Sequence, residues 1–117
     1  MKRLLSILML ACAAAGAQTK GGPALTGNTD NGKRLFLKNG CYQCHGQAGQ
    51  GGLAGARLAQ IKLAQPAFIA YVRNPAPGGM PPYRAKVMSD QELADVFAYI
   101  KTFPEPPAAN TIPILNQ

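Results

Sequence analysis

Residues 41–45 are Cys41-Tyr42-Gln43-Cys44-His45, and the rest of the chain is organised around them. Two thiols separated by two residues and followed directly by a histidine are typical of a c-type haem attachment site. In such a site Cys41 and Cys44 form thioether bonds along one edge of the porphyrin, and His45 lies under the iron as its proximal ligand. We therefore predict one covalently attached haem c, because the sequence contains one such motif and a single histidine.

Two other kinds of site use a similar pair of thiols. A redox dithiol normally opens a helix within a βαβ unit, and the sequence shows no alternation of strands and helices. A zinc site needs four ligands, and the third cysteine, Cys12, lies far away in a leader-like segment. The surrounding sequence therefore favours haem.

Residues 1–17 have the composition of a secretory signal peptide. A basic start is followed by an apolar run and then by small residues at Ala15-Gly16-Ala17. Cleavage after Ala17 predicts a protein exported to the bacterial periplasm, with no transmembrane segment after processing. The alternative is lipid anchoring through Cys12, although Leu10 is large for a lipobox position that is usually small.

The chain is basic, with a formal net charge of +7 from 12 Lys and Arg residues against 5 Asp and Glu residues. The basic residues do not cluster, and export argues against nucleic acid as a partner. These basic residues either form an ordinary solvated surface or produce an electrostatic field that steers the protein onto the acidic docking surface of a redox partner.

The chain is long enough for one domain, which we place at residues 30–104. Residues 18–29 are rich in glycine, threonine and asparagine, a composition that predicts a flexible or loosely docked lead-in. Thr29 or Asp30 can then cap a first helix, which Gly40 ends beside the haem motif.

Two further helices follow the motif. Pro66 begins a short one, and a longer one starts at a capping box formed by Ser89 and Glu92 and ends before Pro104. The fold class is therefore all-α, with three to four short helices and long Gly- and Pro-rich loops around the haem. We expect the glycine-rich loop of residues 46–55 to pass close to the flat cofactor.

Residues 75–84 are Pro-Ala-Pro-Gly-Gly-Met-Pro-Pro-Tyr-Arg. A thioether is a weak, neutral ligand that stays bound only where the backbone holds it, and the prolines stiffen this loop. We therefore predict Met80 as the second axial ligand. Met88 is a competing sulfur, but it immediately precedes the cap of the last helix and is interpreted as packing.

Taken together, these residues resemble the class I cytochromes c, and among them the small single-haem bacterial ones. The resemblance covers roughly residues 30–103 and rests on the Cys-x-x-Cys-His motif together with the Gly-Met-Pro-Pro loop. It implies the cytochrome c fold, in which the first and last helices cross at right angles beside the haem. The residues that match the crossing positions are Gly32, Phe36, Val96 and Tyr99.

One position departs from the family pattern. The family usually has a Gly-Pro step whose carbonyl accepts the proximal imidazole N–H, and this chain has Gly55-Ala56 there. A carbonyl is present either way, so the contact can survive, but the residue that provides it stays open. Arg57 is a candidate to reach a haem propionate, and Tyr83 to hydrogen-bond near Met80 or a propionate, each set against simple exposure to solvent.

The predicted function is one-electron transfer. With His45 and Met80 on the iron and Cys41 and Cys44 on the porphyrin, no position is open to a substrate, so we predict no enzymatic activity. The protein would be a monomer or a subunit of a redox complex. Two alternatives stay open: an electron-accepting subunit of a dehydrogenase or oxidase that docks through the Pro-rich tail of residues 105–117, and a gas-binding or sensor protein with a displaceable Met80.

Overall fold

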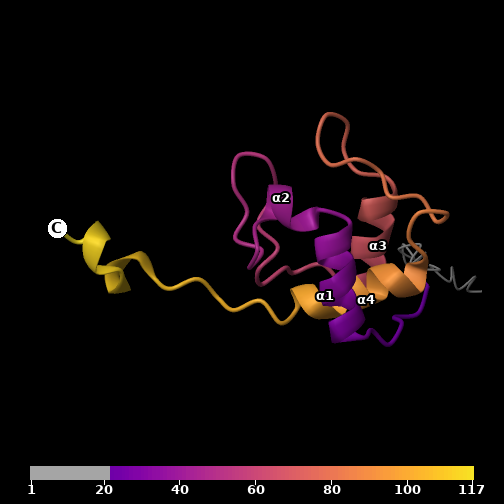
Figure 1. The fold of residues 1–117 in the computed structure, drawn as a ribbon, viewed down its shortest axis with the longest axis horizontal. Helices are drawn as coiled ribbons and strands as arrows, with labels where there is room; N and C mark the ends of the chain where they lie inside the picture. The colour runs from indigo at the N-terminus through magenta and orange to yellow at the C-terminus, as the bar shows by residue number, and fades with distance from the viewer. Residues whose placement is uncertain (1–21) are drawn as a thin grey trace, which may run out of the picture.

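The computed structural model describes residues 22–117, which form four α-helices and two short 3-10 helices (Figure 1). The elements are α1 (Thr29–Lys38), α2 (Cys41–His45), α3 (Gln65–Arg73), α4 (Asp90–Ile100), η1 (Ala109–Thr111) and η2 (Pro113–Leu115). No strand forms within the described part of the chain, and the predicted all-α fold class is confirmed. The predicted signal peptide and Cys12 lie outside the described residues. Among residues 22–117, no helix has the length and apolar character needed to cross a membrane.

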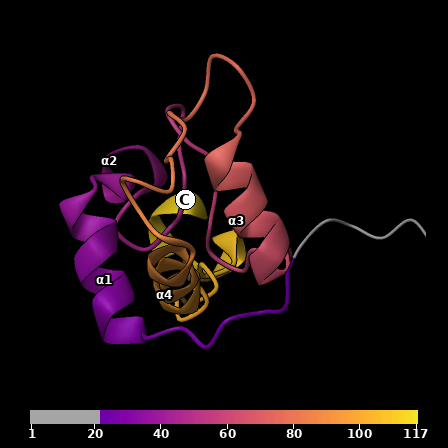
Figure 2. The ribbon, with the colours of Figure 1, turned by 90° about the vertical axis from the view of Figure 1, so that its right-hand side faces the viewer.

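α1 and α4 cross in direct contact, and α3 packs on another side of α4 (Figure 2). Gly32 lies at the crossing, where a Cβ would overlap the carbonyl oxygen of Asp95. One turn later Phe36 is fully buried, and its ring meets those of Tyr99 and Phe103 edge to face, with centroids 5.5 Å apart in both pairs. Val96 is also buried. The crossing positions expected from the family resemblance are therefore confirmed.

Side-chain hydrogen bonds cap the N-termini of α1 and α4, and the cap of α1 differs from the predicted one. The N-cap of α1 is Asn28, not Thr29 or Asp30, because the Asn28 side chain accepts the N–H of Asn31 at 2.9 Å from an extended backbone. The predicted capping box of α4 is confirmed, since Ser89 Oγ accepts the Glu92 N–H and the Glu92 carboxylate accepts the Ser89 N–H.

Asp95 is a buried carboxylate that the sequence analysis did not single out. It lies in α4 with 4% of its surface exposed. Its two oxygens accept hydrogen bonds from the Asn28 N–H at 2.8 Å, the Asn31 amide at 2.7 Å and the Gln91 amide at 3.0 Å. Burial alone would raise the pKa of Asp95, but these three donors outweigh it and hold the pKa below its ordinary value.

The same region fastens the segment before α1. The Gln65 side chain bonds both the N–H and the carbonyl of Leu25, at 2.6 and 2.8 Å, and Gln91 donates to the Thr26 carbonyl at 2.7 Å. Side chains from α3 and α4 thus bind backbone groups of residues 25–28, which lie within the lead-in predicted for residues 18–29.

We expect Asp95→Asn to destabilise the folded protein at neutral pH by about 1–3 kcal/mol, because an amide cannot accept all three hydrogen bonds. The difference in free energy of unfolding between the wild type and Asp95→Asn should shrink as the pH falls. The pKa of Asp95 is lower in the folded chain, so its contribution is complete above the unfolded value near 3.8 and is lost as acid protonates the folded group. Urea unfolding at several pH values measures this.

Asp30→Asn is the control, because Asp30 is an exposed carboxylate in the first turn of α1. Its stability difference from wild type should be a few tenths of a kcal/mol, as expected for a charge near a helix N-terminus. A wild-type advantage over Asp95→Asn that stays constant down to strong acid would contradict the role given to Asp95.

Candidate functional site

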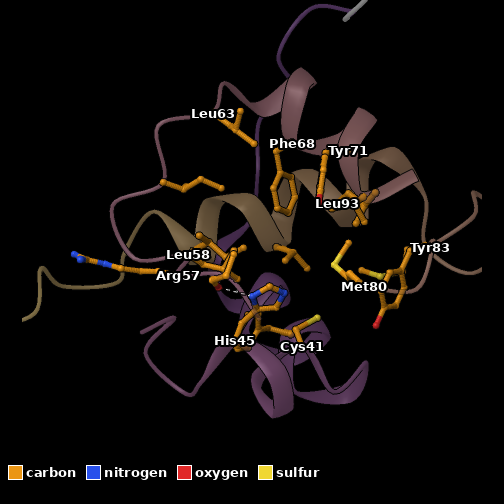
Figure 3. Close-up of a pocket in the computed structure, with 17 residues that line it drawn as sticks. Cys41, His45, Arg57, Leu58, Leu63, Phe68, Tyr71, Met80, Tyr83 and Leu93 are labelled. Carbon is orange, nitrogen blue, oxygen red and sulfur yellow. Dashed lines mark hydrogen bonds between the residues drawn. The ribbon is translucent and has the colours of Figure 1, made fainter. Parts of the chain in front are cut away.

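A cavity of about 300 Å³ opens between the helices and the loop that carries Met80 (Figure 3). Its walls are mainly apolar and include the side chains that form the domain core. The core residues that line it are Phe36, Phe68, Val72, Met88, Leu93, Val96 and Ile100. The domain is therefore built around a largely apolar space rather than around a closed core.

His45 lies on the wall of this cavity, at the end of α2 (Figure 3). Its Nδ1 is 2.6 Å from the carbonyl oxygen of Ala56. A carbonyl can only accept, so Nδ1 carries the proton and donates, which leaves the lone pair on Nε2. Ala56 thus provides the carbonyl that the family pattern assigns to a proline. The imidazole is held in the tautomer and orientation that suit a metal ligand.

The glycine-rich loop brings Ala56 to this position. Gly55 lies so close to Cys44 that a Cβ would come within 2.6 Å of the Cys44 carbonyl oxygen. None of the loop glycines lines the cavity. The glycines were expected to make room for the cofactor, but the structure shows that Gly55 makes room for the backbone of the haem motif. This close approach is what places the next carbonyl beneath the imidazole.

The two motif cysteines are free, and they differ in exposure. Cys41 is half-buried and lines the cavity, whereas Cys44 is exposed and is not among the lining residues. Burial raises the pKa of the Cys41 thiol. A reactive dithiol needs a lowered thiol pKa, so this environment does not suit redox catalysis. Within residues 22–117 no group of three or more His, Cys, Asp or Glu side chains is arranged to hold a metal ion.

Two methionines line the cavity. Met80 is partly buried in the Pro-rich loop, and Met88 is 2% exposed and belongs to the domain core. The burial of Met88 agrees with its interpretation as packing. The structure brings both sulfurs to the site, so the choice of Met80 as ligand stays a prediction.

Arg57 and Tyr83, the two residues predicted to contact a propionate or Met80, also lie on the cavity. Arg57 contributes to the cavity wall, but its guanidinium extends outward (Figure 3). Tyr83 also lines the cavity, and its hydroxyl donates to the Asn39 carbonyl at 3.1 Å, so this hydrogen bond goes to the chain beside the haem motif rather than to Met80.

Residues 27–100 match a protein-family model described as cytochrome c oxidase, cbb3-type, subunit III. The chain belongs to this family of class I c-type cytochromes. No curated protein and no solved structure gave a significant match to the chain. Membership of the family gives this cytochrome its general activity, which is haem-based electron transfer.

The cavity of the cytochrome fits a haem. Its walls are apolar, and a histidine with a free Nε2 and a thioether-bearing side chain lie on them. Imidazole and thioether are the ligand pair used by cytochromes c, and the first cysteine of the attachment motif lines the same space. His45, Met80, Cys41 and Cys44 are the residues that would hold it.

Proposed function

We propose that this cytochrome is a periplasmic one-electron carrier with His45 and Met80 as the axial ligands of a single, covalently attached haem c. The observation that carries the proposal is the 2.6 Å contact of His45 Nδ1 with the Ala56 carbonyl oxygen. Because Nδ1 holds the proton in this contact, the lone pair of Nε2 is free to bind the iron. Met80 lies on the wall of the same cavity.

The bound haem supplies reversible one-electron change between ferrous and ferric iron. The chain does the rest. His45 and Met80 would be the two protein ligands of the iron, and Cys41 and Cys44 would attach the porphyrin covalently. The mainly apolar walls would shield the haem from water. With both ligand positions taken, no position would remain for a substrate, which supports a carrier rather than an enzyme.

The leader-like residues 1–17 support export, and the net charge of +7 supports docking onto an acidic surface of a redox partner. Such a field accelerates encounter and is screened by salt. Electron exchange with a partner should therefore slow as the ionic strength rises.

Met80→Ala is expected to remove the distal ligand and lower the reduction potential, on the order of 100 mV or more, within the wide range that axial ligands control. Thioether ligation favours the ferrous state, so its loss favours the ferric state. The weak near-infrared sulfur-to-iron band of the oxidised protein should disappear with it. Voltammetry and absorption spectroscopy measure both effects.

Met88→Ala is the matched control, since its sulfur lies on the same cavity. It should keep the near-infrared band and lose about 2–5 kcal/mol of stability, because it truncates a buried side chain. A band that survives in Met80→Ala and vanishes in Met88→Ala would assign the ligand to Met88. Rapid binding of carbon monoxide by the reduced wild type would favour the gas-binding alternative.

A subunit of a redox complex is the second candidate, and the C-terminal tail favours it. η1 and η2 pack against each other and against none of the described α-helices, and the tail runs away from them (Figure 1). Asn116 donates to the carbonyls of Ala109, Asn110 and Ile112, which keeps the turns folded. Ile114 and Leu115 are 74% and 63% exposed, so the tail carries an exposed apolar end that a partner in a complex would cover.

Removal of residues 106–117 should leave the haem spectrum and melting temperature unchanged, since η1 and η2 contact none of the described α-helices. It should abolish co-purification with an oxidase or dehydrogenase in an extract of the native cells. The double variant Ile114→Ser/Leu115→Ser should do the same while keeping the length of the tail. A full-length protein that purifies only as a free monomer would rule out the subunit role.

A further inference from the structure

The loop that carries Met80 is stiff but poorly attached. Within the described chain, residues 75–82 make no hydrogen bond, and a Cβ added at Gly78 would have no heavy atom within 4 Å. Prolines restrict the backbone of this segment, but they do not connect it to the domain. Met80 itself packs against the hydrophobic core, and the first hydrogen-bonded residue after it fixes the C-terminal side of the loop.

That residue is Tyr83, three positions beyond Met80. Its N–H donates to the Val72 carbonyl at 3.1 Å, and its hydroxyl donates to the Asn39 carbonyl at 3.1 Å. Val72 belongs to α3, and Asn39 is the C-cap of α1, two residues before Cys41. Tyr83 thus links the Met80 loop to the segment that carries the haem motif.

Arg73 completes the attachment. Its guanidinium donates through Nη1 to the Tyr83 carbonyl at 2.6 Å and through Nη2 to the Asp90 carboxylate at 2.5 Å. Arg73 ends α3, and Asp90 begins α4. One side chain therefore connects the end of α3, the anchored residue Tyr83 and the start of α4. The Arg73 side chain is 15% exposed and the Asp90 side chain 65% exposed, so the hydrogen bond to the Tyr83 carbonyl is partly buried, whereas the ion pair with Asp90 is open to solvent.

We propose that Arg73 and Tyr83 are positioning residues that hold the Met80 thioether on the iron. The inference rests on the proposed His45/Met80 ligation. A thioether binds iron weakly, so the bond persists only if the loop cannot move away. The two side chains provide that restraint from α3, α4 and the end of α1, which are all rigid elements.

Competition by imidazole for the iron of the oxidised protein measures the restraint. We expect Tyr83→Phe, which removes one hydrogen bond and keeps the ring, to bind imidazole about 3- to 10-fold more tightly than wild type. Arg73→Gln removes a charged, two-armed contact and should give an increase of about 10-fold or more. The near-infrared sulfur-to-iron band should weaken in the same order.

A matched control is available in the same region. Arg84 is exposed, and its guanidinium makes no hydrogen bond or ion pair within residues 22–117. Arg84→Gln should bind imidazole like the wild type. Arg73→Lys should fall between Arg73→Gln and wild type, because an ammonium keeps the charge but lacks the planar fork.

The outcomes separate this inference from the proposed function. Absence of the near-infrared band in the wild type itself would overturn Met80 ligation. A wild-type band that is unchanged in Arg73→Gln and Tyr83→Phe, with unchanged imidazole affinity, would leave the ligation in place and overturn the positioning role. A lower melting temperature with an unchanged band would also overturn it, since the two residues would then only stabilise the fold.

Discussion

The double variant Cys41→Ala/Cys44→Ala, exported normally, is expected to be largely unfolded or degraded. The core residues surround a cavity of about 300 Å³, which the haem is proposed to fill. At roughly 24 cal/mol per Å³ for an enclosed cavity, leaving that volume empty costs at most about 7 kcal/mol. The whole stability of a domain of this size is only about 5–15 kcal/mol. Circular dichroism of the haem-free chain should show little helix.

Gln43→Ala is the control for this experiment. Gln43 lies between the two cysteines and is exposed, so its replacement keeps both thiols and the length of α2. This variant should carry haem and melt like the wild type. A haem-free double variant with native-like helix content and a cooperative melt would show that the polypeptide supplies its own core, and the coupling of haem binding to folding would be wrong.

Gly32→Ala is expected to have the second large effect, a loss of about 3 kcal/mol or more of stability, at or beyond the upper end for overpacking in a core. A methyl group at this position meets the backbone carbonyl of Asp95, which cannot move aside as a side chain can. α1 and α4 must separate. The hydrogen bonds of Asn28 and Asn31 to Asp95 then stretch as well. Denaturant unfolding of the haem-loaded protein measures the loss.

Gly52→Ala makes the same chemical change where there is room, because no heavy atom lies within 4 Å of an added Cβ. We expect a change within about 0.5 kcal/mol, as for other surface substitutions. Equal stabilities for the two variants would mean that the helix crossing tolerates a side chain, and that the close contact at Gly32 is not a requirement of the fold.

The two large effects have one physical origin. The crossing of α1 and α4 forms one wall of the cavity, with Phe36 on one helix and Val96 and Ile100 on the other. The crossing therefore also positions the walls that would contact the haem. Weakening it should lower both stability and haem retention, whereas loss of Met80 should change the potential with a smaller effect on folding.

The sequence by itself determined the features that depend on near neighbours. The spacing of Cys41, Cys44 and His45 predicted the cofactor, since two-residue spacing and an adjacent histidine are local chemistry. The capping box of Ser89 and Glu92 predicted the start of α4 for the same reason. The family resemblance added the helix crossing at Gly32. The first two depend on short local patterns, whereas the crossing is a tertiary contact that came from the family resemblance alone.

Only the tertiary structure decided which distant groups meet. Asp95 accepts a hydrogen bond from Asn28, 67 positions away, and Tyr83 reaches Asn39 across 44 positions. Before the chain folds, nothing distinguishes Asp95 from an exposed helical carboxylate. The family resemblance predicted that the carbonyl that orients His45 belongs to the Gly55-Ala56 step. The structure shows that it is the Ala56 carbonyl. Hydrogen bonds between distant residues are set by how helices and loops pack, and local sequence does not specify that packing.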